Sequence, residues 1–169
     1  MTFKTIIKTV FIFSIFIGIS SCIDKTKTVD NRNAIGIFNY DNEQQLTEYN
    51  KLNLDDTHPN LLNPQISKSD HSLVMKSWAN LHQKLGNHLS ENKFNWEVED
   101  STITVVHKIY FTPQGAIENY FFNVLNKTVR IEKKEEYANL ISSFAKNNRI
   151  EYKKDSNFAQ CGKTKYLNN

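Results

Sequence analysis

Apolar positions recur with helical spacing in the middle of the chain. Val74, Trp78, Leu81, Leu85 and Leu89 follow one another at steps of four, three, four and four residues. These steps return to one side of an α-helix, so the pattern predicts an amphipathic helix of about five turns that buries this stripe. Ser69 or Asp70 is suited to cap its first turn, and the pattern ends near residues 91–92.

Strand periodicity follows the helix. Residues 102–111 and 116–125 are rich in β-branched and aromatic side chains, and Thr112-Pro113-Gln114-Gly115 separates them. Proline presets the first corner of a turn and glycine accepts the left-handed position that closes it, so a β-hairpin is predicted. Its register stays open, because Ile117 can pair either with Phe111, through a bulge, or with Tyr110.

The remaining segments give weaker patterns. Residues 132–148 predict a second helix, and Tyr137, Leu140, Ile141 and Phe144 form its apolar face. We interpret 35–40 as a strand or docking segment, 41–53 as a helix, 54–68 as a loop, 94–98 and 150–152 as short strands, and 156–169 as a polar C-terminal tail. The predicted fold class is α+β, with a small antiparallel sheet centred on the hairpin and two helices packed on one face.

The first 22 residues have the layout of a secretory signal. Lys4 and Lys8 precede an apolar run over 10–19, and Ser20-Ser21-Cys22 follows at once. The run is short for a transmembrane helix. The ending resembles the lipobox of bacterial lipoproteins, in which signal peptidase II cleaves before a lipid-modified cysteine; Ile19 stands where leucine is usual.

The lipobox resemblance implies the organisation of the whole chain. Residues 1–21 would be a signal peptide, Cys22 the lipidation site, 22–34 a polar tether and 35–155 a single α+β domain. We therefore expect a palmitate-bearing lipoprotein of the cell envelope that reaches the membrane through the Cys22 lipid. Residue 23 is Ile rather than Asp, which under the familiar sorting rule implies the outer membrane.

The amino-acid composition limits the classes of function that we expect for this protein. Removal of residues 1–21 from the 169-residue chain leaves 148 residues, with 19 Lys and Arg against 18 Asp and Glu. A near-neutral domain without a basic stripe gives no indication of nucleic-acid binding. Eleven Phe, seven Tyr and two Trp in the whole chain indicate a packed core.

Cys161 and His107 are the candidate functional residues besides Cys22. A lipid on Cys22 would leave Cys161 without a partner in the chain, and a buried or inert thiol is the expectation for it. His107 lies on the predicted strand face that carries Ile103, Val105 and Ile109. A Cys161–His107 pair across the sheet is the alternative, and it would indicate a cysteine- or histidine-dependent hydrolase.

Metal and cofactor signals are missing from the sequence. His71 and His82 face nearly the same side of the long helix, but three turns, roughly 16 Å, separate them, which is too far for one ion. His88 points away from both. The chain contains no P-loop, G-x-S-x-G, H-E-x-x-H or C-x-x-C motif. We therefore expect no metal, no cofactor and a non-catalytic domain.

A second resemblance concerns topology. The predicted order of strand, glycine-containing turn, strand, helix and short strand over about 102–152 resembles the TonB C-terminal domain, with Gly115, Ile117 and the helix around Leu140-Ile141 as the matching cues. The chain lacks a Pro-rich spacer, so the resemblance implies the shape and no energy-coupling role. The expected function is binding of an envelope protein partner or a ligand; the alternatives are the hydrolase and an immunity-type inhibitor of an incoming toxin.

Overall fold

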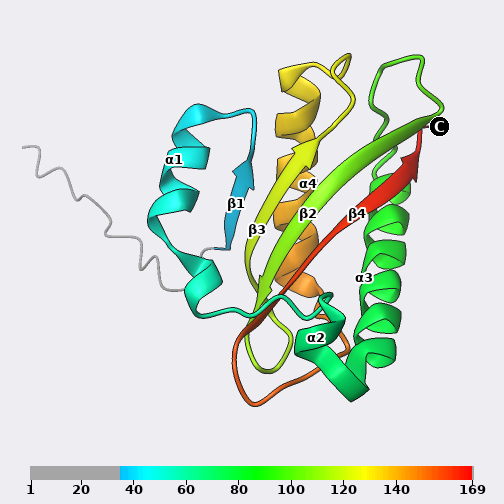
Figure 1. Cartoon of the computed structure of the whole chain (residues 1–169). Helices are drawn as coiled ribbons and strands as arrows, with labels where there is room; N and C mark the ends of the chain where they lie inside the picture. Colours follow the sequence, from blue (N-terminus) through cyan, green and yellow to red (C-terminus); the bar gives the residue numbers. More distant parts are fainter. Residues whose placement is uncertain (1–34, 169) are drawn as a thin grey trace, which may run out of the picture. The chain divides into compact units, whose positions relative to one another are not determined.

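A four-stranded sheet with strand order β1-β3-β2-β4 carries two long helices on one face (Figure 1). The structure is a computed structural model and describes residues 35–168. Its strands are β1 (Gly36–Asn39), β2 (Thr102–Phe111), β3 (Ile117–Val124) and β4 (Phe158–Leu167). Its α-helices are α1 (Glu43–Lys51), α2 (Pro64–Ser67), α3 (His71–Glu91) and α4 (Ile131–Asn147), and short 3-10 turns occupy Leu54–Asp56 and Lys68–Asp70.

The hairpin forms in the first of the two registers that the sequence allows. Phe111 pairs with Ile117, and an irregularity between Tyr110 and Phe111 lets Tyr110 pair with Asn119. Gly115 closes the turn at φ 79° and its N–H donates to the Thr112 carbonyl at 2.9 Å. The turn chemistry of the sequence therefore predicted this connection correctly.

The α+β class is confirmed, and so are the two helices on one face. The sheet is mixed, however, because β1 runs parallel to β3 while both other pairings are antiparallel. A tight turn forces its two strands to be antiparallel, but β1 and β3 are far apart in the chain and no hairpin constrains them.

The core lies between the sheet and the two helices. The whole predicted stripe of α3 is buried, and α4 buries Tyr137, Ile141 and Phe144. Tyr137 packs edge-on against Phe122 of β3, with ring centroids 5.1 Å apart. Among the helices of the described part, none is long and apolar enough to cross a membrane.

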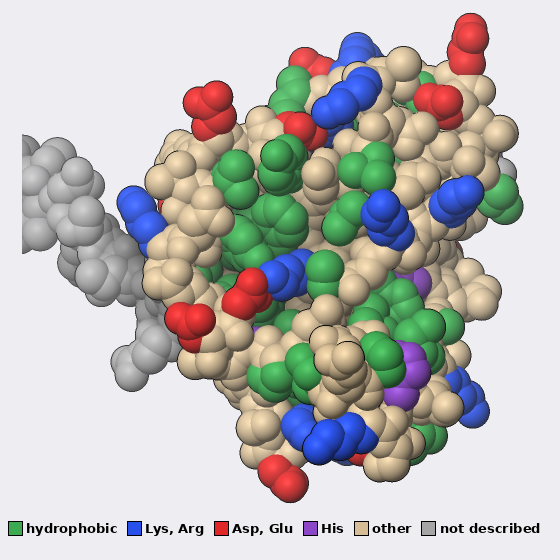
Figure 2. Space-filling view, in the orientation of Figure 1, with side chains coloured by type: hydrophobic (Ala, Val, Ile, Leu, Met, Phe, Trp, Pro, Cys, Tyr) green, Lys and Arg blue, Asp and Glu red, His purple; other side chains and the backbone are tan. Residues whose placement is uncertain are grey.

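The opposite face of the sheet is covered only in part. Tyr49 of α1 stacks on Phe121, and the loop after α1 places Asp55 beside Lys108 and Tyr110. Burial alone would raise the pKa of Asp55, but hydrogen bonds from Lys108 and Tyr110 outweigh it and lower the pKa. Figure 2 views this face, where apolar side chains and lysines are interspersed.

The predicted C-terminal tail over 156–169 is wrong. Phe158–Leu167 form β4, which pairs with β2 in one unbroken antiparallel register from Phe111↔Phe158 to Thr102↔Leu167. The sequence predicted that the domain ends at residue 155, but the domain extends to the end of this strand. Phe158 and Tyr166, which the sequence offered as anchors, are both buried.

Two short predicted strands do not form. Phe94 and Trp96 are buried and alternate with exposed residues, as predicted, but Glu97 adopts φ 52° and the segment joins no sheet. Residues 150–152 also lie outside the strands; the nearest pairing is an isolated bridge between Ala116 and Arg149. Alternating burial thus arose from two anchored aromatic rings rather than from a β-ladder.

Candidate functional site

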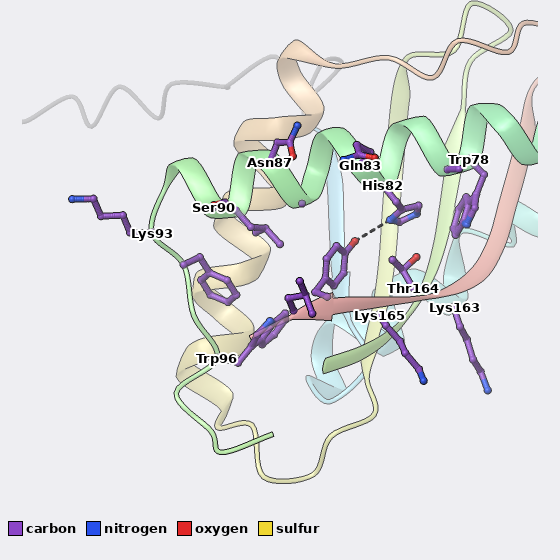
Figure 3. A pocket seen from close by; sticks show the side chains of 16 residues that line it. Trp78, His82, Gln83, Asn87, Ser90, Lys93, Trp96, Lys163, Thr164 and Lys165 are labelled. Carbon is purple, nitrogen blue, oxygen red and sulfur yellow. Dashed lines mark hydrogen bonds between the residues drawn. The ribbon is translucent and has the colours of Figure 1, made fainter. Parts of the chain in front are cut away.

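A groove of about 870 Å³ lies between α3, the loop that follows it and the final part of β4 (Figure 3). Trp78, His82 and Gly86 line it from α3, and Phe94 and Trp96 line it from the loop. Residues 163–167 of β4 form the opposite wall. Its size falls within the range of pockets that hold small ligands or side chains of a partner.

The loop wall is fixed to the end of β4 by Asn168. The Trp96 N–H donates to Asn168 Oδ1 at 3.0 Å, and Asn168 Nδ2 donates to the carbonyls of Val98 and Asp100 at 2.7 and 2.9 Å. The Trp96 ring packs against Phe94 and Tyr137, at 4.8 Å between centroids in each case. Because these contacts hold both walls to the core, the groove is preformed.

Two neutral histidines lie side by side: His82 lines the groove, and the fully buried His107 of β2 packs against it. The rings of His82 and His107 are 4.5 Å apart, and Trp78 lies 4.0 Å from His82. His82 Nδ1 shares a hydrogen bond with the Tyr166 hydroxyl at 2.9 Å, and His107 Nδ1 shares one with the Tyr120 hydroxyl at 2.8 Å. Each tyrosine fixes the orientation of its histidine ring.

Burial keeps both imidazoles uncharged. It lowers the pKa of His82 from 6.5 to about 3. The pKa of His107 is also held well below its usual range, first by burial and then by repulsion from a charged His82. The inner end of the groove is consequently uncharged at neutral pH.

Several buried polar atoms around the histidines have no hydrogen-bond partner among residues 35–168. They include Nε2 of His82, Nε2 of His107 and Oγ1 of Thr164. His82 and Thr164 both line the groove, and Figure 3 shows Thr164 on the same side of β4 as His82. Buried polar groups usually find partners in proteins. Because these atoms are closed off from solvent, the side chains that can hydrogen-bond a ligand in the groove are the exposed Gln83, Asn87 and Ser90 of its lining.

The outer edge of β4 is paired over only part of its length. The Ala159 N–H donates to the Pro59 carbonyl at 3.0 Å, the Leu61 N–H donates to the Ala159 carbonyl at 2.8 Å, and the Cys161 N–H donates to Asn60 Oδ1 at 3.1 Å. These bonds show that the backbone groups of odd-numbered residues point away from β2.

The unbroken register carries this alternation onward along the strand. The N–H and carbonyl groups of Lys163 and Lys165 therefore point outward, and they receive no backbone partner within the described residues. This unpaired edge forms one wall of the groove. Exposed strand edges are templates for pairing with another chain.

The charged side chains that line the groove are basic. Lys93, Lys163 and Lys165 are among its lining residues, and no Asp or Glu of residues 35–168 lines it. In Figure 3 the side chains of Lys163 and Lys165 extend from β4 away from the cavity, toward the open face of the sheet. They flank the strand edge rather than fill the groove.

The candidate residues from the sequence are not brought together. Cys22 lies outside the described residues. In β4 Cys161 is opposite Lys108 and Gly162 is opposite His107, so Cys161 and His107 point to opposite faces of the sheet. The Cys161–His107 pair of the hydrolase alternative is therefore wrong.

The Cys161 thiol is also poorly suited to act as a nucleophile. Burial raises its pKa and Asp55 raises it further, while Lys108 opposes them. A thiol with a raised pKa carries little thiolate at neutral pH. Within residues 35–168, no three His, Cys, Asp or Glu side chains converge in a group that could hold a metal ion.

Comparison of the chain with protein-family models, with curated proteins and with solved structures finds no match. The interpretation of the groove therefore depends on its own geometry.

Proposed function

We propose that this protein is a lipid-anchored lipoprotein of the cell envelope, attached to the outer membrane through Cys22, with a non-catalytic binding domain. The signal-like N-terminus and the resemblance of Ser20-Ser21-Cys22 to a lipobox support the anchor. The polar stretch over 23–34 supports a tether between the lipid and the domain.

We propose further that the domain binds an extended segment of an envelope protein along β4. The observation that carries this proposal is the unpaired outer edge at Lys163 and Lys165 beside a preformed groove. A segment that adds to a strand edge gains main-chain hydrogen bonds, and its alternate side chains enter whatever pocket borders that edge. The groove between α3 and β4 supplies such a pocket.

Replacement of Cys22 by Ala tests the anchor. We expect the unmodified chain to partition into membrane fractions and the Cys22→Ala chain to leave them, because no acyl chain is then attached. Incorporation of labelled palmitate provides a second readout. Unchanged membrane fractionation of the variant, together with unchanged labelling, would contradict lipidation at this residue.

Gly86 offers a way to fill the groove without disturbing the core. A Cβ built on Gly86 meets no atom within 4 Å, and the residue lines the groove from α3. We expect Gly86→Leu to stabilise the fold by about 0.5–1 kcal/mol, since leucine favours helix over glycine. The same change should reduce cross-linking of envelope proteins, through a photoreactive residue placed at the exposed Leu167 of β4, at least about tenfold.

Gly86→Ala is the matched control for this variant. It gains similar helix propensity but adds only one methyl group, so cross-linking should remain close to that of the unmodified chain. Equal cross-linking by the Leu and Ala variants would show that the groove is not where the partner binds.

A further inference from the structure

We propose that the segment that pairs with β4 carries carboxylates at the two positions beside Lys163 and Lys165, and an uncharged amide or hydroxyl side chain at the position between them. This inference rests on the proposed function, because it specifies the chemistry of the same partner. It predicts a three-residue pattern of acidic, neutral polar and acidic residues.

The two carboxylate positions of the added segment follow from the residues on the side of β4 that faces away from the helices. Lys163 and Lys165 are both exposed, and they lie two residues apart, so their side chains share one face of the sheet. Their neighbours on β2 are Val106 and Thr104, which carry no charge. Neither lysine forms a salt bridge within the described residues. An added strand would place alternate side chains directly opposite them, where opposite charges are favoured.

The neutral position of the added segment follows from the residues on the side of β4 that faces the groove. Thr164 faces the helices between the two lysines, and the α3 wall of the groove carries the exposed polar side chains of Gln83, Asn87 and Ser90. His82 is only 6% exposed and its imidazole is uncharged at neutral pH. Figure 3 shows the Lys93 side chain pointing away from the cavity, so a carboxylate at this position would lack a counter-charge beside it, whereas an amide or hydroxyl can donate and accept hydrogen bonds with the polar lining.

Labelled peptides test this pattern against the full chain in detergent micelles. The probe is a nine-residue peptide of alternating Thr and Val with Glu-Asn-Glu at its centre, and the comparison peptide has Lys-Asn-Lys there. The central triplet reads the same in both directions, so the orientation of the added strand does not matter. Fluorescence anisotropy at low salt gives the two dissociation constants.

We expect the Glu-Asn-Glu peptide to bind about 5- to 30-fold more tightly than the Lys-Asn-Lys peptide, on the basis of two cross-strand ion pairs. The double variant Lys163→Glu with Lys165→Glu should reverse this preference. Replacement of the central Asn by Asp should weaken binding at least about fivefold, because the added charge is buried without a partner.

The outcomes separate this inference from the proposed function. One outcome is that both peptides bind equally to the unmodified chain and fail to bind to the Gly86→Leu variant. That result would overturn the acidic pattern but leave strand addition intact. It would indicate that the lysines only protect the edge from aggregation. Tighter binding of the Lys-Asn-Lys peptide would also overturn the pattern. Binding of neither peptide would overturn both proposals.

Discussion

Acidification from pH 7 to pH 5 is expected to lower the free energy of unfolding by about 2 kcal/mol through His82, with a further loss through His107. Both His82 and His107 have folded-state pKa values below that of an unfolded histidine. Between pH 6.5 and the folded-state value, the unfolded chain binds more protons, so stability falls as pH falls. For His82 this window extends from 6.5 to about 3.

Carboxylates contribute little to this effect. The pKa of Asp55 is lowered in the folded chain, so its stabilising contribution is present above the unfolded value of 3.8 and is lost only as pH falls below it. Histidine titration therefore dominates between pH 7 and pH 5. Domains of this size are stable by about 5–15 kcal/mol, so the expected loss is a large share of the total.

His82→Gln is the variant that isolates one histidine. Gln does not titrate and still offers a hydrogen-bond partner to the Tyr166 hydroxyl. We expect its loss of stability between pH 7 and pH 5 to be smaller by about 2 kcal/mol than that of the unmodified chain, as measured by denaturant unfolding at both pH values. A loss equal to that of the unmodified chain would show that His82 is not buried in its neutral form.

Lys165→Pro is expected to abolish binding along β4 while leaving the fold intact. The Lys165 N–H points outward and has no partner within the described chain, so proline removes no bond to β2. It removes one donor for the added strand, and its ring obstructs the approach of that strand. We expect cross-linking through the probe at position 167 to fall at least about tenfold.

Two further variants serve as controls for this change. Lys165→Ala removes the same charge but keeps the N–H, so its cross-linking should fall only by the roughly 1.5- to 5-fold that one exposed ion pair contributes. Thr164→Pro removes an N–H that faces β2 and should destabilise the sheet by about 3 kcal/mol. Retention of full cross-linking in Lys165→Pro would argue against main-chain pairing at this edge.

The elements that the sequence predicted well are those whose periodicity comes from one buried face. The stripe from Val74 to Leu89 packs on the sheet as α3, and Ile103, Val105 and Ile109 face the helices from β2. In each case an apolar side chain occupies nearly every inward position, so the period is visible in the sequence.

β4 was missed because the three inward positions in its middle are not apolar. Gln160, Gly162 and Thr164 face the helices, and the Trp78 ring fills the space above Gly162, where a Cβ would approach Trp78 Cζ2 to 3.0 Å. The strand is stabilised by long-range pairing with β2, which no local pattern encodes. The sequence signal that could have indicated it is the alternation of Lys163, Lys165 and Leu167 with Thr164 and Tyr166.

The candidate site was missed for the same reason. It requires β4 beside α3, and the sequence pointed to His82 only as a candidate metal ligand, which its distance from His71 excluded. His107 was correctly assigned to the apolar strand face, but its contact with His82 depends on the packing of α3 over the sheet. Tyr120 and Tyr166, which orient the two rings, come from strands on either side of β2.

Amide hydrogen exchange at β4 tests strand addition most directly. In the free full-length chain, the outward N–H groups of Lys163 and Lys165 should exchange rapidly, whereas those of Gly162 and Thr164, which face β2, should exchange slowly. With the Glu-Asn-Glu peptide at 100 times its dissociation constant, we expect exchange at Lys163 and Lys165 to slow by about 100-fold. Unchanged rapid exchange at these two amides while the peptide is bound would contradict strand addition at β4.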